Sequence, residues 1–302
     1  MVNAFKWYTL KSIPDEEISF EFTSSGTSGQ KSHILWDEAS KERQRIMRER
    51  IMKTLGLVSD KKVNYILFAY SPEVGGKRGA AYAHRMYTTF APTKEIFFTI
   101  RADSKGEPFF DVQGTIEAIK RFANDDVPVR FIGFPAFMHE ILTIMRSKGI
   151  RLSLPEESLV ITAGGWKDKE DKRIPIEMFQ HEFYEVLGVK KSRIRDVYGF
   201  VEHGVPYITC PNGNFHIPIY SRAYARRPGS LDLVDYGEKG LLHVISPYNM
   251  AQPAISVLST DYVRINRHCG CGIDTDYIEI LGRAGVKKHQ GCAITATELL
   301  KE

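Results

Sequence analysis

The sequence predicts an α/β protein with a large, mainly parallel sheet, followed by a smaller β-rich part. Over residues 18–198, short apolar runs with strand character alternate with longer segments of helical periodicity. Such alternation is typical of sheets with much parallel pairing. After Gly204 the pattern changes to short strands and turns with frequent Pro and Gly. We therefore expect an α/β core over residues 1–205 and a β-rich subdomain over residues 206–302.

The separate elements follow from hydrophobic periodicity. Apolar runs bounded by turn residues predict strands at residues 18–23, 63–70, 95–100, 129–133, 159–163 and 194–198. Apolar positions at helical spacing predict helices at residues 37–55, 111–124, 136–148 and 175–187. Ligands of open α/β sheets bind beyond the carboxyl ends of the strands. The loops 24–32, 164–166 and 198–202 each follow a predicted strand, so we expect them to converge on one site.

Composition excludes several classes of function. The formal net charge is only +4, from 41 basic and 37 acidic residues, which argues against nucleic acid and membrane surfaces but suits an anionic ligand. The N-terminus has no secretion signal, and the longest apolar runs are too short to span a bilayer. We expect a cytoplasmic protein whose four cysteines are reduced and serve metal binding or catalysis rather than disulfides.

A loop rich in glycine and hydroxyl groups is the first candidate for binding phosphate. Residues 23–32 read TSSGTSGQKS, and the spacing does not match a Walker loop. Backbone N–H and hydroxyl groups in such a loop can surround phosphate oxygens. The candidate residues are Ser24, Ser25, Gly26, Thr27, Ser28, Gly29 and Lys31. On its own, the segment is equally compatible with a plain linker.

This loop resembles the phosphate loop of the adenylate-forming (ANL) superfamily, whose pattern is S-G-T-T-G-x-P-K. Residues 25–29 are in step with the pattern, whereas the proline is missing and the lysine comes one position early. An ending in Lys-Ser without proline is more similar to the acyl-protein synthetase (LuxE-type) branch. Relatives of the phenylacetate–CoA ligase type resemble the chain as well.

Later motifs resemble the same superfamily in the same order. Gly164-Gly165 follows a predicted strand and resembles the turn that lines the adenine pocket. Residues 196–202 (DVYGFVE) resemble Y-G-x-[ST]-E, which implies that Tyr198 and Gly199 lie at the nucleotide. The same motif implies that Glu202 holds Mg²⁺, a hard cation that prefers carboxylate oxygen. Asp261 resembles the aspartate that binds ribose, and Gly282-Arg283 resembles the G-R motif that follows it.

The resemblance implies an ANL-type adenylation domain that activates a carboxylic acid with ATP and Mg²⁺, and resemblance to the LuxE-type branch implies a fatty acid. It assigns nucleotide and acyl binding to residues 1–205. The carboxylate would attack the α-phosphate of ATP and release pyrophosphate, with loop donors, Mg²⁺ and Arg283 neutralising charge. Part of the usual sheet is expected to be missing, because the sequence before the phosphate loop is short.

The C-terminal segment departs from the larger superfamily. Residues 288–299 (KHQGCAITATEL) resemble K-x-x-G-x-x-I-x-x-x-E-L, after which we expect no C-terminal lid domain. Cys292 follows a glycine in the loop that approaches the acyl-adenylate in relatives, which implies an internal acyl acceptor. Lys287, Lys288 and His289 lie just upstream, where positive charge favours the thiolate. The alternative is an inert cysteine. Cys292, Glu202 and Arg283 are the expected catalytic residues.

The other cysteines suggest a structural zinc site in the β-rich subdomain. Three thiols and one imidazole form a favourable zinc set, supplied by Cys210, His216, Cys269 and Cys271. Relatives of the phenylacetate–CoA ligase type have a similar arrangement. The alternative is separate, unligated cysteines.

Three functions stay open at this point. The first is an acyl-protein synthetase that works beside an acyl reductase or an acyl-carrier protein. The second is an acid–CoA ligase, and the third is a weakly catalytic scaffold subunit of a reductase complex. His84 and His203 are candidates for the acid pocket, or are surface histidines. The sequence names neither the acid nor the oligomeric state.

Overall fold

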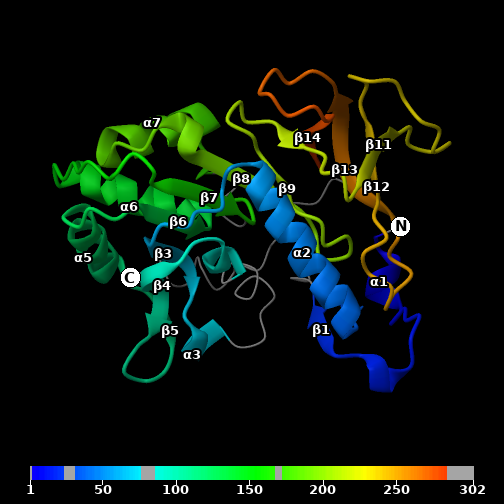
Figure 1. The fold of residues 1–302 in the computed structure, drawn as a ribbon, viewed down its shortest axis with the longest axis horizontal. Coiled ribbons are helices and arrows are strands. Elements are labelled where there is room, and N and C mark those ends of the chain that lie inside the picture. Colours follow the sequence, from blue (N-terminus) through cyan, green and yellow to red (C-terminus); the bar gives the residue numbers. More distant parts are fainter. Residues whose placement is uncertain (1, 24–30, 76–85, 167–171, 284–302) are drawn as a thin grey trace. The chain divides into compact units, whose positions relative to one another are not determined.

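The structure, a computed structural model, describes residues 2–23, 31–75, 86–166 and 172–283 (Figure 1). These residues form two compact units. Residues 2–56 group with residues 197–283 in one unit, and residues 57–196 form the other. The predicted division into residues 1–205 and 206–302 rests on the change of sequence pattern after Gly204, and it stays a prediction.

The unit of residues 57–196 is built on a largely parallel sheet. Its strands lie in the order β5-β4-β3-β6-β7-β8, and β9 Tyr207–Ile208 pairs antiparallel with the last two residues of β8. β3 pairs in parallel with β4 and β6, β6 pairs in parallel with β7, and β5 is antiparallel to β4. The strand bounds are β3 Val63–Tyr70, β4 Thr93–Ala102, β5 Pro108–Phe110, β6 Val129–Gly133, β7 Leu159–Ala163 and β8 Ile194–Tyr198, whose last two residues begin the other unit.

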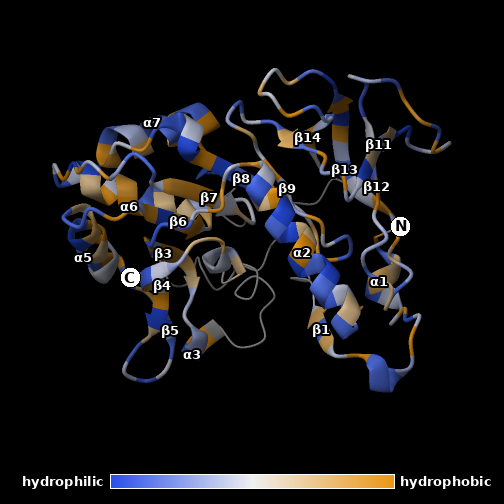
Figure 2. Cartoon of the chain, in the orientation of Figure 1, coloured by the Kyte–Doolittle hydropathy of each residue, from blue (hydrophilic) through white to orange (hydrophobic). Residues whose placement is uncertain are grey.

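Three amphipathic helices cover one face of this sheet. They are α5 Val112–Ala123, α6 Pro135–Ser147 and α7 Ile176–Leu187. Asp111 caps α5 by accepting a hydrogen bond from the Gly114 N–H at 2.8 Å, and Gly188 ends α7 in the left-handed conformation. Their apolar faces join Ile66, Phe131 and Val160 in one buried core. Figure 2 shows the apolar character along β6 and β7 that this core requires.

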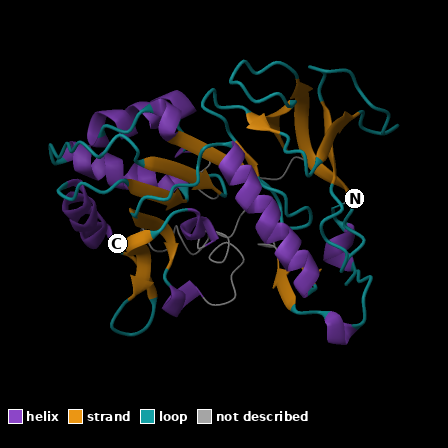
Figure 3. Ribbon diagram, in the orientation of Figure 1, coloured by secondary structure: helices purple, strands orange, loops and turns teal. Residues whose placement is uncertain are grey.

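The other unit contains an N-terminal hairpin, a long helix and an antiparallel sheet. β1 Phe20–Thr23 pairs with β2 His33–Trp36, and α2 Glu38–Thr54 follows, capped by Asp37. The five-stranded sheet has the order β10-β14-β13-β12-β11, and its strand pairs are antiparallel. The remaining strands are β9 Tyr207–Ile208, β10 Phe215–His216, β11 Arg222–Arg226, β12 Gly240–Ile245, β13 Ser256–Asn266 and β14 Tyr277–Arg283. No helix occurs within residues 205–283 (Figure 3).

The short helices complete the description. They are α1 Ala4–Trp7, α3 Pro72–Gly75 and the 3-10 turns Asp15–Glu17, Tyr87–Phe90 and Lys191–Arg193. Within the described residues, no helix combines the length and the apolar character that crossing a bilayer requires.

A buried loop between β12 and β13 ties the N-terminal segment to the antiparallel sheet. The Gln252 side-chain amide donates to the carbonyl oxygens of Leu10 and His33, at 2.8 and 2.9 Å. Asn249 donates to the Leu35 carbonyl oxygen at 3.3 Å. Both amide side chains are almost fully buried. Contacts between residues more than two hundred positions apart therefore hold this unit together.

The predicted α/β fold class is confirmed, with a mixed sheet rich in parallel pairs. Each predicted helix and strand has a counterpart whose bounds differ by a few residues at most. The predictions did not include β2, β5 or the short helices. β13 is also longer, at 11 residues, than the short strands expected in this part of the chain.

Candidate functional site

An aspartate at the centre of the antiparallel sheet is held by several neighbours. The Tyr198 hydroxyl donates to Asp261 Oδ2 at 2.6 Å. Ser259 Oγ lies 3.4 Å from the same oxygen and accepts from the Asp261 backbone N–H at 2.8 Å. Burial, reinforced by the Asp261 charge, raises the pKa of Tyr198 well above its ordinary value, so the phenol stays a donor. Asp261 is therefore fixed in orientation before any ligand arrives.

Arg283 faces the other oxygen of this aspartate. Asp261 and Arg283 are register partners on β13 and β14, and Arg283 Nε lies 3.5 Å from Asp261 Oδ1. The arginine side chain is 52% exposed, whereas that of Asp261 is 15% exposed. An exposed pair of this kind adds little stability. Arg283 is thus free to exchange its carboxylate contact for an anionic ligand at low energetic cost.

A second pair joins the beginning of β2 to the turn after β8. Ser32 Oγ donates to Glu202 Oε1 at 2.5 Å, across 170 residues of sequence. Ser32 is fully buried, and Glu202 is 6% exposed. The sequence predictions included Glu202 but not its partner, because a serine that ends a Ser/Gly loop carries no signal of a long-range contact.

The histidine after Glu202 is buried, so its interpretation as a surface residue is wrong. His203 Nε2 lies 2.9 Å from the Tyr207 hydroxyl, which lies 2.7 Å from Ser221 Oγ. Burial lowers the pKa of His203 to about 3, so the ring is neutral at ordinary pH. His84, the other histidine considered for an acid pocket, lies outside the described residues.

Much of the expected phosphate loop cannot be compared with the structure. Ser24 to Gly29 lie outside the described residues, and Lys31 is exposed. The residues that flank the loop are described, since Thr23 and His33 are register partners in the β1–β2 hairpin. The predicted loop is therefore the connection between two paired strands. Its phosphate-binding role stays a prediction.

The predicted adenine turn belongs to the unit of residues 57–196. Gly164 and Gly165 directly follow β7 and have φ values of 85° and 66°, a conformation that favours glycine. Gly199 follows Tyr198 at the end of β8 and has the Val205 carbonyl oxygen 3.4 Å from where a Cβ would lie. Their contacts with a nucleotide stay predictions.

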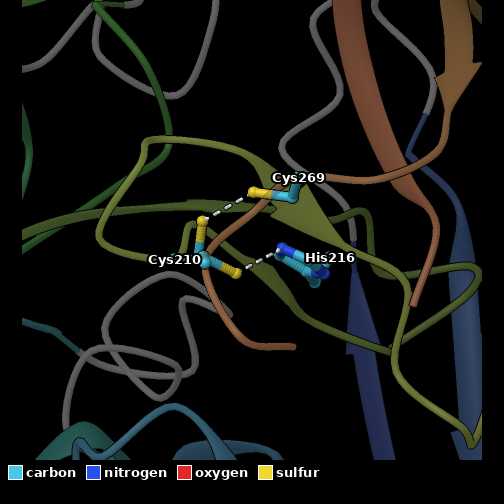
Figure 4. Close-up of side chains that lie close together, drawn as sticks. Cys210, His216 and Cys269 are labelled. Atoms are coloured by element: carbon cyan, nitrogen blue, oxygen red, sulfur yellow. Dashed lines mark hydrogen bonds between the residues drawn. The ribbon is translucent and has the colours of Figure 1, made fainter. Parts of the chain in front are cut away.

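The structure brings the predicted zinc ligands together. The ligand atoms of Cys210, His216, Cys269 and Cys271 all lie within 4.8 Å of one another. The sulfurs of Cys210 and Cys269 lie 3.5 Å apart and face each other (Figure 4), and His216 Nε2 lies 3.2 Å from the Cys271 sulfur. The cysteines are therefore grouped rather than separate, and their binding of zinc stays a prediction.

Two segments of the chain supply the cluster: the connection between β9 and β10, and the loop between β13 and β14. Cys210 and His216 lie on either side of the turn between β9 and β10, and the C-x-C pair lies between β13 and β14. Gly270 and Gly272 have φ values of 73° and 88° and allow this second loop to turn tightly around the thiols.

Neighbouring polar groups prepare these four side chains for a cation. His216 Nδ1 bonds to the Thr275 hydroxyl at 2.9 Å, which leaves Nε2 toward the thiols. Burial raises the pKa of Cys210 to about 11. Burial also opposes ionisation of Cys269, but the Asn214 amide donates to its sulfur at 3.1 Å, and the net effect lowers the Cys269 pKa. Donor set and supporting contacts both fit tetrahedral zinc.

Cys292, the predicted acyl acceptor, lies outside the described residues. Its role stays a prediction. Of the remaining predicted catalytic residues, Glu202 and Arg283 are both in the unit that contains Asp261.

Comparison with protein families decides the identity of the chain. The family model described as "Acyl-protein synthetase, LuxE" matches residues 1–301. The chain belongs to this LuxE family of acyl-protein synthetases. It is accordingly a ligase, and the predicted family relationship is confirmed.

Two curated relatives carry the same name. The chain is 26% identical over 306 residues to the "Long-chain-fatty-acid--luciferin-component ligase" of Aliivibrio fischeri, covering 99% of this chain and 78% of the relative. It is 24% identical to the protein of that name from Vibrio harveyi, covering 97% of this chain and 75% of the relative.

Two solved structures share the fold. A 2-hydroxyisobutyryl-CoA ligase superposes with a TM-score of 0.60 at 15% identity, covering 90% of this chain and 58% of the ligase. ATP-bound MatB from Rhodopseudomonas palustris gives a TM-score of 0.57 at 14% identity, covering 90% of this chain and 49% of MatB. The chain thus spans about half the length of these two proteins. The predicted ANL-type adenylation fold is confirmed.

Proposed function

We propose that the chain activates a long-chain fatty acid with ATP as an acyl-adenylate and transfers the acyl group to its own Cys292. The observation that carries the proposal is the family match over residues 1–301, together with relatives named as long-chain-fatty-acid ligases that align with 99% and 97% of this chain. The adenylate-forming fold supports the use of ATP, since MatB has been solved with ATP bound.

In the first step, a carboxylate oxygen of the acid attacks the α-phosphorus of ATP. A new P–O bond forms, the bond to the β-phosphate breaks, and pyrophosphate leaves. Asp261, already oriented by Tyr198 and Ser259, accepts hydrogen bonds from the ribose hydroxyls. Arg283, 3.5 Å from that carboxylate, neutralises charge on the nucleotide. The loop from Ser24 to Gly29 donates to phosphate oxygens, with Lys31 adding positive charge.

Glu202 supplies the carboxylate that would hold Mg²⁺. Its side chain is almost completely buried, and its hydrogen-bond partner in the described residues is the neutral Ser32 hydroxyl. A buried carboxylate without a cationic partner is costly, so the residue suits a divalent cation. When bound, Mg²⁺ neutralises phosphate charge during phosphoryl-group chemistry.

In the second step, the Cys292 thiolate attacks the carbonyl carbon of the acyl-adenylate. The C–S bond forms, the C–O bond to phosphate breaks, and AMP leaves. The thioester would then be delivered to an acyl reductase or an acyl-carrier protein. Lys287, Lys288 and His289 lie close to Cys292 in sequence and favour the thiolate.

The test is intact-protein mass after incubation with ATP, Mg²⁺ and a panel of fatty and aromatic acids. We expect an acyl-sized, hydroxylamine-labile adduct on the wild type and none on Cys292→Ser, with no adduct on either protein when ATP is omitted. Pyrophosphate release without an adduct would move the acceptor to CoA or a carrier protein. No pyrophosphate release with any acid would contradict acid activation and favour the scaffold function.

We also propose that Cys210, His216, Cys269 and Cys271 hold a structural zinc ion. The proposal is supported by the 4.8 Å grouping of the ligand atoms and by the Asn214 and Thr275 contacts. Zinc with a complete set of protein ligands is structural rather than catalytic. Bound there, it would cross-link the two turns that carry the ligands.

A further inference from the structure

The Glu202 carboxylate is in an unusual setting for a buried charge. Its side chain is 6% exposed, and within the described residues no salt bridge to it occurs. The hydrogen bond from Ser32 Oγ reaches Oε1 at 2.5 Å, which is within the short range of charge-assisted O–H···O⁻ bonds. One oxygen of the carboxylate is thus engaged by a neutral donor, while Oε2 has no such partner among the described residues.

Both members of the pair are anchored by the fold. Ser32 is fully buried and directly precedes β2, whose first residue, His33, pairs with Thr23 of β1. Glu202 lies in the turn after β8, where the N–H groups of His203 and Gly204 donate to the Phe200 carbonyl oxygen. Because both residues adjoin hydrogen-bonded backbone, the bond from Ser32 Oγ sets the orientation of the Glu202 carboxylate relative to these two segments.

We propose that Ser32 is a positioning residue that holds Glu202 for binding a divalent cation through one oxygen, and so favours Mg²⁺ over Ca²⁺. The proposal rests on the proposed function, in which Glu202 is the Mg²⁺ ligand. Mg²⁺ requires near-octahedral geometry and short bonds to single carboxylate oxygens, whereas Ca²⁺ readily accepts both oxygens of one carboxylate at longer distances. A hydroxyl that occupies Oε1 opposes the second arrangement.

The variant Ser32→Ala removes the hydroxyl and frees Oε1. We expect the Mg²⁺ concentration that half-saturates pyrophosphate release to rise roughly tenfold, the effect of losing one hydrogen bond to a charged group. We also expect Ca²⁺ to inhibit the variant more strongly than it inhibits the wild type, at the same ratio of Ca²⁺ to Mg²⁺. Ser32→Thr, which keeps the hydroxyl, should restore both values toward those of the wild type.

The matched control is Ser158→Ala, which removes an equally buried serine hydroxyl in the unit of residues 57–196. It should leave both the half-saturating Mg²⁺ concentration and the inhibition by Ca²⁺ unchanged. The comparison thus separates a general loss of stability from a change in cation preference. Ser32→Cys is a near-isosteric change to a weaker donor, so we expect smaller changes of the Mg²⁺ and Ca²⁺ concentrations in the same direction. This variant takes the place of Ser32→Ala if Ser32→Ala does not fold.

Manganese binding distinguishes this proposal from the function on which it rests. Mn²⁺ affinity is measured by electron paramagnetic resonance in the presence of ATP and without acid. If no acid supports turnover but Ser32→Ala weakens Mn²⁺ binding about tenfold, the proposed function fails and the role of Ser32 stands. The role of Ser32 would be overturned if folded Ser32→Ala had the same Mn²⁺ affinity and the same Mg²⁺ and Ca²⁺ dependence as the wild type. It would also be overturned if the wild type did not bind Mn²⁺.

Discussion

At the scale of single residues, the most informative side chain is Asp261. It is oriented by one phenol and one serine hydroxyl, while its second oxygen faces an exposed arginine. A carboxylate held in this way loses little conformational freedom when it accepts hydrogen bonds from a ligand. The arrangement favours binding of a diol such as ribose, with the guanidinium available to a nearby anion.

Removing the Tyr198 hydroxyl tests this preorganisation. Tyr198→Phe keeps the ring but deletes the 2.6 Å hydrogen bond to Asp261 Oδ2. We expect the KM for ATP in pyrophosphate release to rise roughly tenfold, with a smaller change in kcat, because a hydrogen bond to a charged group is worth about 1.5–3 kcal/mol.

The control is a second tyrosine–aspartate pair in the same unit. The Tyr236 hydroxyl bonds to Asp276 at 2.9 Å, and Tyr236 is 49% exposed. Tyr236→Phe should leave the KM for ATP unchanged, since water replaces this exposed bond. An unchanged KM in Tyr198→Phe would show that the phenol does not prepare Asp261 for the nucleotide.

Sequence motifs indicated candidate site residues, but they did not indicate the side chains that contact those residues. Asp261, Arg283 and Glu202 were predicted as site residues because each lies in a short pattern with a chemical requirement. Ser32 and Thr275 were not, because a single hydroxyl gains its contact only when the fold brings it to a distant partner. Thr275 reaches His216 across 59 residues, and no local pattern encodes that contact.

At the scale of elements, the loop between β12 and β13 joins the beginning of the chain to its second half. Gln252 is 1% exposed and donates to two carbonyl oxygens of the N-terminal segment. Buried carbonyl groups need such partners, since an unpaired buried acceptor costs about 1–3 kcal/mol. One amide side chain therefore holds a segment that precedes it by more than two hundred residues.

The variant Gln252→Ala should lower the free energy of unfolding by about 2–3 kcal/mol, because it leaves the Leu10 and His33 carbonyl groups without their donor. Urea unfolding followed by circular dichroism measures the change. The matched variant is Gln113→Ala, which removes an exposed glutamine of α5 that bonds only to Glu117. That surface change should stay within about 0.5 kcal/mol of the wild type, and an equal effect of the two variants would contradict the anchoring role.

The same elements show how far periodicity predicts a fold. β3 was predicted with its observed bounds, because all its residues are buried and the apolar run is continuous. β2 has an equally buried pattern but only 4 residues, and it follows a Ser/Gly loop, so it was not recognised. The grouping of residues 2–56 with residues 197–283 was not foreseen either, since it depends on long-range contacts such as those of Gln252.

At the scale of the whole molecule, the cluster of Cys210, His216, Cys269 and Cys271 is the feature at which we expect a stabilising ion. Its three thiols and imidazole come from the β9–β10 segment and from the loop between β13 and β14, and Cys210 is fully buried. In the absence of a metal, the close thiols offer each other only weak hydrogen bonds. A bound cation would replace these contacts with coordinate bonds and would join the β9–β10 turn to the loop before β14.

We therefore expect freshly purified protein to contain about one equivalent of zinc, and a strong chelator to lower the unfolding temperature reversibly. A ligand that binds only the folded state at a thousand times its Kd adds about 4 kcal/mol of stability. Cys210→Ser should lose the metal and part of this stability, whereas Cys292→Ser, which changes none of the four proposed ligands, should keep both. Metal analysis with calorimetry measures these values. Less than about a tenth of an equivalent of zinc in the wild type, or chelation without a change in unfolding temperature, would contradict a structural zinc site.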